Sequence, residues 1–158
     1  MTVSIVGLLQ RISPPGVAPA GWAPREVGVE ELSALLGAAR VAPSADNLQI
    51  WRFVSVRAEE TRRRLAEAVP EPLRAACGEA PLLLAACGVK ALVTRARREQ
   101  PFSMVDVPIA FSHLLLQAAE LGLASAWTLD PDEARVRVVL GIPPEVRVVA
   151  LLALGWPA

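Results

Sequence analysis

The sequence is poor in the side chains that most often build metal and nucleophilic sites. Histidine occurs once, as His113, and cysteine twice, as Cys77 and Cys87. A single histidine excludes a multi-histidine metal site within one chain, and cysteines ten residues apart fit neither a Cys-x-x-Cys redox pair nor a zinc-finger spacing. We expect two small buried thiols. Because His113 falls on an apolar helical stripe near Ala110 and Leu114, we also expect a buried structural histidine.

The chain also lacks an excess of charge of either sign, and it lacks long apolar runs. Sixteen basic and sixteen acidic residues give zero net charge, so the totals do not indicate a basic face for nucleic acid. No uninterrupted apolar run approaches the ~20 residues of a membrane-spanning helix. The first ten residues lack the basic start and the cleavage pattern of a signal peptide. We therefore expect a cytoplasmic protein without nucleic-acid or membrane partners.

What the chain does have is enough apolar material for one sizeable core. Its 158 residues suit a single domain over residues 1–158, and a hydrophobic content of 53% is too high for a disordered chain. Helical and extended patterns alternate along it, which predicts an α/β or α+β protein. Helices are expected over 2–10, from 29 to the turn at 42–44, over 58–69, from 103 to a stop at Gly122, and from 130 to a stop at Gly141; strands are expected over 51–56, 80–87, 124–129 and 146–154.

Two of the expected helices carry recognisable start signals. Ser103 followed three residues later by Asp106 resembles a capping box, with Asp in the place of the usual Glu. Asp130 before Pro131 predicts a second start, in which the acid caps the helix and proline occupies the first turn. The segment between the first two helices, residues 13–24, is rich in proline and glycine and is expected to be an irregular connector.

Common catalytic motifs are absent: there is no Gly-x-Gly-x-x-Gly, no Gly-x4-Gly-Lys, no Gly-x-Ser-x-Gly and no His-Glu-x-x-His. The segment that stands out is a polar loop before the strand at Trp51, which holds Ser44, Asn47 and Gln49. Each of these side chains offers a donor and an acceptor, and loops on rigid elements often carry binding groups. The alternative is a turn whose side chains satisfy local backbone groups. The residues alone favour this alternative.

Read from Ala42 to Phe53, this loop has the pattern Ala-Pro-Ser-x-x-Asn-x-Gln-x-Trp-x-Phe, which resembles the Ala-Pro-Ser-x-x-Asn-x-Gln-Pro-Trp-x-Phe signature of the FMN-dependent nitroreductase family. Residues 9–13, Leu-Gln-Arg-Ile-Ser, are similar to the end of the family's first helix. Residues 106–122 resemble its central helix, and residues 124–141 with Gly-Trp-Pro at 155–157 resemble its closing pattern. Four pieces in the family's order span nearly the whole chain, which is therefore identified as a short, C-terminally truncated member.

The resemblance implies an α+β fold with a central, mostly antiparallel sheet flanked by helices, assembled as a homodimer with FMN at the subunit interface. It implies that NADH or NADPH gives hydride to the flavin, which then reduces a small acceptor such as a nitroaromatic or a quinone by a ping-pong mechanism. By position, Arg11 and Ser13 would contact the phosphate; Pro43, Ser44 and Asn47 would meet the partner subunit's flavin, with Gln49 nearby; and the backbone of Trp127, Thr128 and Leu129 would pass the flavin ring, with one N–H directed at N5.

Structural roles for the same residues stay open. Arg11 can be a surface arginine that interacts with a helix C-terminus, and Trp127 can belong to the core rather than to the wall of a flavin site. Trp51 is expected in the core or at a dimer interface. No catalytic side chain and no metal ligand is expected, because the flavin would carry the chemistry.

The chain departs from the family pattern mainly in its cations. Ile12 replaces a middle arginine, Pro15 replaces a further basic residue, and Ile50 replaces the signature proline. The chain also ends at Ala158, before a basic residue that many members carry, and Arg95, Arg97 or Arg98 could replace the missing charge. Each lost charged hydrogen bond weakens phosphate binding by roughly 1.5–3 kcal/mol. A second hypothesis is therefore a catalytically silent dimer that acts as a flavin carrier or an interaction module.

Overall fold

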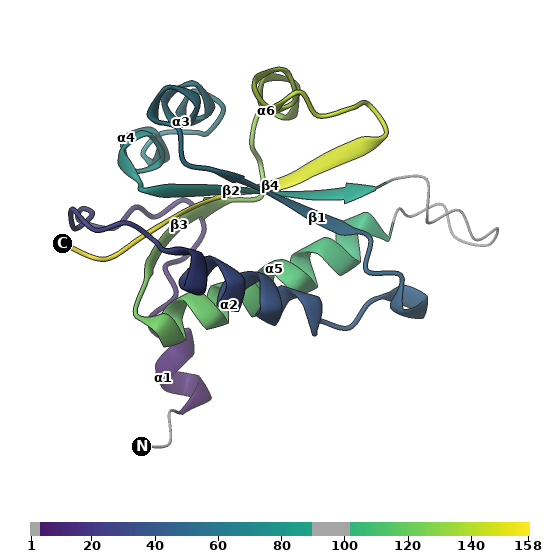
Figure 1. Cartoon of the computed structure of the whole chain (residues 1–158), viewed down its shortest axis with the longest axis horizontal. Helices are drawn as coiled ribbons and strands as arrows, with labels where there is room; N and C mark the ends of the chain where they lie inside the picture. Colours follow the sequence, from purple (N-terminus) through teal and green to yellow (C-terminus); the bar gives the residue numbers. More distant parts are fainter. Residues whose placement is uncertain (1–3, 90–101) are drawn as a thin grey trace.

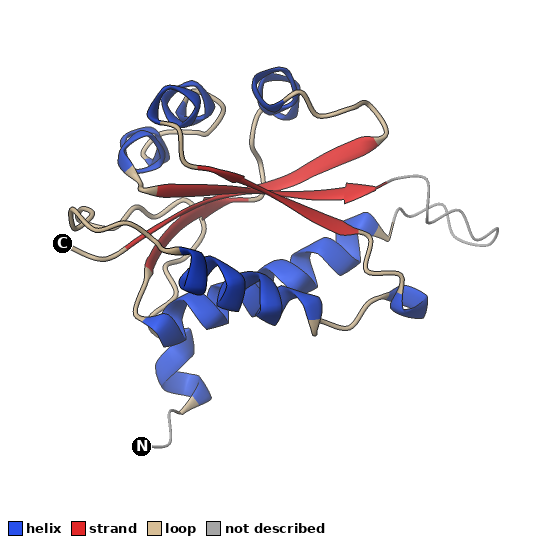
Figure 2. Ribbon diagram, in the orientation of Figure 1, coloured by secondary structure: helices blue, strands red, loops and turns tan. Residues whose placement is uncertain are grey.

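One antiparallel sheet lies between two layers of helices in the computed structural model, which describes residues 4–89 and 102–158 (Figures 1 and 2). The basic stretch from Lys90 to Gln100, including Arg95, Arg97 and Arg98, lies outside the described residues. The arrangement of helices around an antiparallel sheet confirms the α+β class.

The sheet consists of β1 (Trp51–Val56), β2 (Leu82–Val89), β3 (Ala124–Thr128) and β4 (Val146–Gly155). Their order is β1-β2-β4-β3, and every neighbouring pair is antiparallel. The two central strands, β2 and β4, are the nearly continuous apolar runs of the sequence, and helices cover both of their faces. All four predicted strands are confirmed, with ends that differ by no more than two residues.

One face of the sheet is covered by α2 (Val29–Arg40) and α5 (Ser103–Leu121), and α1 (Ile5–Leu9) packs against α5 on the same side. α2 and α5 pack side by side, and their apolar stripes form the larger of the two cores together with the near face of the sheet. α5 ends at Gly122, whose φ of 82° lies in the left-handed region that glycine adopts without strain. The stop predicted at this glycine is confirmed. Trp51 is 6% exposed and belongs to the same core.

The opposite face is covered by α3 (Glu59–Ala66), α4 (Leu73–Glu79) and α6 (Glu133–Leu140). α4 was not predicted, because its seven residues are too few to show a helical period. Cys77 and Cys87 are buried in this second core and are not bonded to each other. Burial raises the pKa of Cys77 to about 12 and that of Cys87 to about 11, so both thiols are protonated at neutral pH. The expectation of two buried thiols is confirmed.

Both predicted helix starts are wrong in their details. Phe102, not Ser103, is the N-cap of α5, and the buried hydroxyl of Ser103 has no hydrogen-bond partner within the part of the chain that is described. At α6 the cap is Asp132, whose carboxylate accepts a hydrogen bond from the backbone N–H of Arg135 at 3.1 Å. The start lies two residues after Asp130, because Asp132 is the residue with extended backbone before the first turn.

α5 is more apolar as a whole than its longest uninterrupted apolar run indicates. Its 19 residues have a mean hydropathy of 1.2, which by length and composition is sufficient to cross a membrane. Counting uninterrupted runs overlooked it because polar residues such as Ser112 and Gln117 break the run. Its buried side chains pack against the sheet, as those of a core helix do.

The predicted irregular connector lies between α1 and α2, and hydrogen bonds fix it to the end of the chain. The N–H of Ala23 donates to the carbonyl of Trp156 at 2.8 Å, and the indole N–H of Trp156 donates to the carbonyl of Glu26 at 3.1 Å. The guanidinium of Arg25 stacks on the Trp156 ring at 3.6 Å. These contacts join residues 23–26 to Trp156, just after the end of β4.

Gly88, at the end of β2, allows this strand to approach the first turn of α5 closely. A Cβ at Gly88 would lie 2.5 Å from the Cβ of Ser103 and 3.1 Å from a Val107 methyl group. We expect Gly88→Ala to lower the free energy of unfolding by about 1–3 kcal/mol, because a Cβ–Cβ clash is not relieved by rotating a side chain. Urea unfolding followed by circular dichroism measures the loss.

Gly78→Ala provides the matched control for this prediction. Its new Cβ would lie at an ordinary 3.7 Å from that of Ala66, inside α4, where alanine is the better helix former. We expect unchanged or slightly higher stability for this variant. Equal unfolding free energies for the two variants would show that β2 and α5 are not in close contact at Gly88.

Candidate functional site

The predicted site residues near the N-terminus meet those of β3 directly. The indole N–H of Trp127 donates to the carbonyl of Ser13 at 2.8 Å, and the N–H of Gly16 donates to the carbonyl of Trp127 at 2.9 Å. The connector after α1 therefore runs along the edge of β3 that does not pair with β4. The Trp127 ring is half-buried and packs against Phe111 with a centroid distance of 5.5 Å. Trp127 thus lines both the core and this edge.

The backbone at Trp127 has a definite direction. In an antiparallel strand, the N–H and C=O of one residue leave the strand on the same side. Because the Trp127 carbonyl accepts from Gly16, its own N–H also points toward the free edge of β3 rather than toward β4. Thr128 then ends the strand, with its buried hydroxyl accepting from the N–H of Asp130 at 3.0 Å, and Leu129 is 51% exposed. This edge presents one outward-facing N–H beside an exposed apolar side chain.

Arg11 lies close to this edge, just after α1. Its side chain is exposed, and its terminal nitrogen lies 3.7 Å from where a Cβ at Gly122 would be, next to the Trp156 ring. Within residues 4–89 and 102–158, Arg11 makes no ion pair and donates no side-chain hydrogen bond. Its guanidinium is therefore free to bind an anion at the C-terminal end of α5.

The loop between α2 and β1 contains the 3-10 turn η1 (Ala45–Asn47) and is held by local bonds. The hydroxyl of Ser44 accepts from the N–H of Gln49 at 3.1 Å. The amide of Gln49 donates to the carbonyl of Arg40 at 3.2 Å and to the side-chain oxygen of Asn47 at 3.4 Å. These are the contacts that the turn interpretation expects. They leave Pro43 and Asn47 exposed at the surface of the loop, and Asn47 retains its side-chain donors.

Asp106 binds this loop and does not take part in the capping box predicted for it with Ser103. Both of its carboxylate oxygens accept from the N–H of Ala45, at 3.2 and 3.3 Å. Burial raises the pKa of Asp106, and the hydrogen bond from Ala45 acts in the opposite direction. The signal for this contact was spacing: Asp106 lies three residues after Ser103 and four before Ala110, on the buried stripe of α5, where a carboxylate needs a hydrogen-bond partner.

The predicted site residues form two separate groups in one chain: those near Arg11 and β3, and those of the loop between α2 and β1. Arg11 lies by Gly122 at the C-terminal end of α5, whereas the loop is bound to Asp106 near the N-terminal end of this helix. Sixteen residues of helix separate Asp106 from Gly122, which is about 24 Å. Figure 1 shows α1 and η1 at opposite ends of α5. A ligand that contacts both groups needs loops from two copies of the chain.

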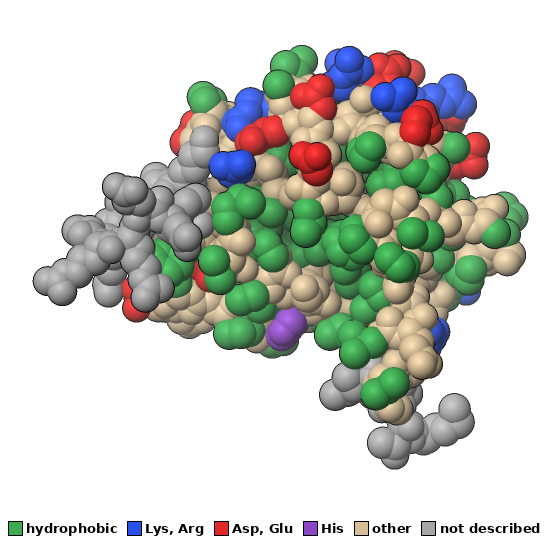
Figure 3. Space-filling model, turned by 180° about the vertical axis from the view of Figure 1, so that it is seen from behind, with side chains coloured by type: hydrophobic (Ala, Val, Ile, Leu, Met, Phe, Trp, Pro, Cys, Tyr) green, Lys and Arg blue, Asp and Glu red, His purple; other side chains and the backbone are tan. Residues whose placement is uncertain are grey.

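His113 is not the buried structural residue that we predicted. It is half exposed and lines a shallow hollow with Leu8, Ala38 and Leu116 on the outer face of α5. The buried stripe of this helix runs through Ala110 and Leu114, and His113 lies one position to its side. In Figure 3 the histidine lies at the surface among hydrophobic side chains.

Charge is distributed unequally between the two helical layers. Five of the eight residues of α3 are charged, whereas α5 has two charged residues in 19, and one of these, Asp106, is buried. The face formed by α1 and α5 exposes large apolar side chains instead, among them Val6, Leu9 and Val105. Figure 3 shows charged side chains gathered over the α3 and α6 layer and hydrophobic ones below it. We call this exposed surface of α1 and α5 the apolar face.

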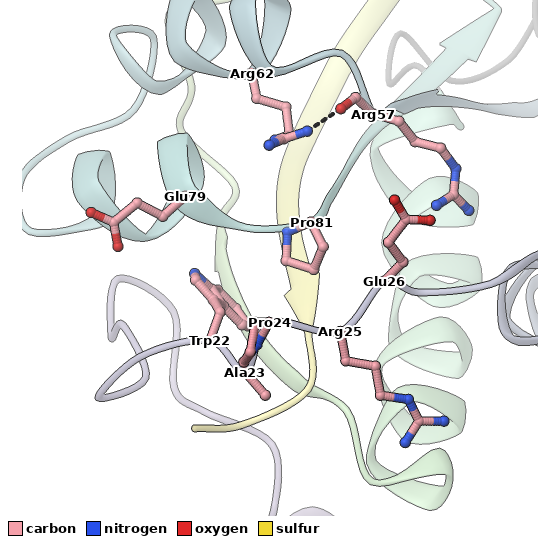
Figure 4. A pocket seen from close by; sticks show the side chains of 9 residues that line it. All are labelled: Trp22, Ala23, Pro24, Arg25, Glu26, Arg57, Arg62, Glu79 and Pro81. Atoms are coloured by element: carbon pink, nitrogen blue, oxygen red, sulfur yellow. Dashed lines mark hydrogen bonds between the residues drawn. The ribbon is translucent and has the colours of Figure 1, made fainter.

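A cavity of about 370 Å³ lies elsewhere, between the connector, the end of β1 and α3 (Figure 4). It is lined by three arginines, Arg25, Arg57 and Arg62, together with two glutamates, but by none of the predicted site residues. Arg62 donates a hydrogen bond to the carbonyl of Arg57. In Figure 4 the guanidinium groups of Arg25 and Arg57 point away from the guanidinium of Arg62. The three cations do not converge on one point, so this cavity is not the candidate site.

Comparison with known proteins identifies the family that the chain resembles. The profile of the Nitroreductase family matches residues 23–85 and 71–156. A protein of Archaeoglobus fulgidus, provisionally named NADH dehydrogenase/NAD(P)H nitroreductase, is 31% identical over 142 residues, which cover 86% of this chain and 78% of that protein. The NADH dehydrogenase of Thermus thermophilus is 33% identical over 159 residues, covering 80% of this chain and 76% of the relative. An FMN-dependent nitroreductase of Clostridium difficile R20291 superimposes with a TM-score of 0.81 at 25% identity, covering 97% of this chain and 87% of that structure.

Proposed function

The chain belongs to the nitroreductase family, and we propose that it is an FMN-dependent oxidoreductase that uses NADH or NADPH to reduce a small acceptor such as a nitroaromatic or a quinone. The observation that supports this most directly is the position of Arg11. Its guanidinium has no ion-pair partner among the described residues, and it lies at the same end of α5 as the edge of β3 that does not pair with β4, where the Trp127 N–H points outward. We further propose that residues 1–158 act as one domain and that the protein works in the cytoplasm.

The residues present fit a phosphorylated flavin at two points. The exposed guanidinium of Arg11 offers the paired donors that bind phosphate oxygens, with the Ser13 hydroxyl nearby on the same segment. The outward N–H of Trp127 is a donor for a ring nitrogen, and the exposed side chain of Leu129 shields that edge from water. When bound, FMN accepts hydride from a reduced nicotinamide and delivers electrons to the acceptor. The chain's own residues bind, orient and shield it.

The second group of residues completes the site only in a dimer. We propose that Pro43, Ser44 and Asn47, with Gln49 beside them, serve the flavin of the opposite subunit. In one chain their loop is bound at Asp106 and Arg11 lies by Gly122, and these two positions are about 24 Å apart along α5. The apolar face supports this assembly, since side chains such as Val6 and Val105 are 62% and 48% exposed in a single chain. Burying this face between two copies would bring each loop toward the other chain's Arg11.

Steady-state kinetics test the proposed function. With FMN present, we expect NADH or NADPH to be oxidised in proportion to enzyme once a quinone or nitroaromatic acceptor is added. Parallel lines in double-reciprocal plots against the two substrates are the result expected of a ping-pong mechanism. Tight flavin binding without turnover of either nicotinamide would instead support the carrier hypothesis, and flavin-independent turnover would contradict both.

A further inference from the structure

The loop between α2 and β1 has a strained backbone. Asp46, Asn47 and Gln49 have φ values of 50°, 56° and 48°, in the left-handed region that residues with a Cβ rarely occupy. Aspartate and asparagine tolerate this region better than other residues do, but glutamine does not share that tolerance. Three such residues within four positions persist only where surrounding contacts determine the conformation.

Contacts from within the loop account for only part of this conformation. The Ser44 hydroxyl and the Gln49 amide bridge the two ends of the loop, as described above. These bonds close the loop on itself, but they do not fix its position relative to the rest of the protein. Among the hydrogen bonds of the described residues, the one between Ala45 and Asp106 connects the turn to an element 61 residues away.

Asp106 is a buried acidic residue that holds the loop from inside the protein. Only 2% of its surface is exposed, and it lies in the first turn of α5, where the helix dipole favours a negative charge. In the described ranges it pairs with no arginine or lysine. The helix turn that carries it is itself fixed, because Ser103 packs directly against Gly88 of β2.

We propose that Asp106 is a positioning residue: its carboxylate holds Ala45 and thereby fixes the strained conformation in which Asn47 and Pro43 are presented to the flavin of the opposite subunit. This proposal rests on the proposed function for its final step, that the loop contacts flavin. The anchoring step stands on the geometry of a single chain. Both oxygens of a buried carboxylate face the Ala45 N–H, at 3.2 and 3.3 Å, and this shared hydrogen bond restrains the turn against α5.

Hydrogen exchange in the flavin-free protein tests the anchoring step. In the wild-type protein we expect the Ala45 amide to be protected, and we expect Asp106→Ala to accelerate its exchange by about tenfold or more while amides in β2 and β4 keep their protection. Asp106→Asn retains a side-chain oxygen and should restore most of the protection. An Ala45 amide that exchanges in the wild type as fast as a solvent-exposed amide would overturn the proposal without any variant.

Flavin titration of the same proteins tests the final step. We expect Asp106→Ala to weaken FMN binding by about tenfold or more and Asp106→Asn to stay within about threefold of wild type. Glu60→Ala removes an exposed acidic side chain from α3, in the helical layer on the opposite face of the sheet, and should bind flavin as wild type does. Wild-type affinity in Asp106→Ala together with a deprotected Ala45 would show that the loop does not position flavin. No flavin binding by the wild type would instead contradict the proposed function, while the exchange experiment would still decide the anchoring step.

Discussion

Arg11→Ala should weaken FMN binding by about tenfold or more while leaving the fold intact. The guanidinium is exposed and has no partner in the described part of the chain, so its removal leaves no buried group unsatisfied. Each charged hydrogen bond to a phosphate contributes about 1.5–3 kcal/mol, and this chain has Ile12 and Pro15 where relatives of its family carry further cations. A site with few cations depends strongly on each one. Fluorescence titration with FMN measures the dissociation constant.

Two controls separate phosphate binding from a general effect of charge. Arg63→Ala removes the same charge from α3, where Arg63 pairs with Glu59 on the opposite helical layer, and should leave the FMN dissociation constant unchanged. Riboflavin, which lacks the phosphate, should bind wild type and Arg11→Ala equally. If Arg11→Ala binds FMN as tightly as wild type, the arginine interacts with the helix end and not with the ligand.

Leu116→Arg should dissociate the proposed dimer into monomers and abolish most flavin binding. Leu116 lines the hollow beside His113 on the apolar face, and it is not among the residues of either core. Burying an unpaired guanidinium between two subunits costs several kcal/mol, which is enough to dissociate an interface of ordinary strength. Sedimentation velocity gives the oligomeric state. FMN affinity should fall in parallel, because the loop of the second chain is then absent from each site.

Val138→Arg is the matched control for this change. Val138 is 77% exposed on α6, in the charged layer on the other side of the sheet. It should remain a dimer with wild-type affinity for FMN. A wild-type protein that sediments as a monomer yet binds flavin tightly would contradict the shared site, since one chain holds Arg11 and Asn47 at opposite ends of α5.

The sequence predicted the buried strands, two helix ends and the position of the signature loop from local patterns. The apolar runs of β2 and β4 could be assigned because burial on both faces leaves little room for polar residues. The stops at Gly122 and Gly141 could be assigned because both glycines adopt a positive φ after a helix. The signature loop was located correctly by its position between α2 and β1, and its family resemblance is confirmed by the profile match.

Contacts between distant segments were not accessible from the sequence. Asp106 was assigned to a local cap, whereas its partner Ala45 is 61 residues away. His113 lies at the surface because it is one position away from the buried Leu114 on α5, and the apolar stripe in the sequence does not define its own edges that closely. The connector runs along β3 because β3 is the last strand in the sheet order and has one unpaired edge. No sequence pattern shows which strand lies at the edge of the sheet. The roles assigned to the nine predicted site residues stay predictions.

The central claim is that two copies of this chain bind FMN through Arg11 of one and the signature loop of the other. Equilibrium titration of the purified protein with FMN, followed by quenching of flavin fluorescence, tests this claim most directly. We predict saturation at one FMN for each chain, with release of flavin when the dimer is dissociated by dilution. Absence of saturable binding, or a stoichiometry that does not change when the chain is monomeric, would contradict it.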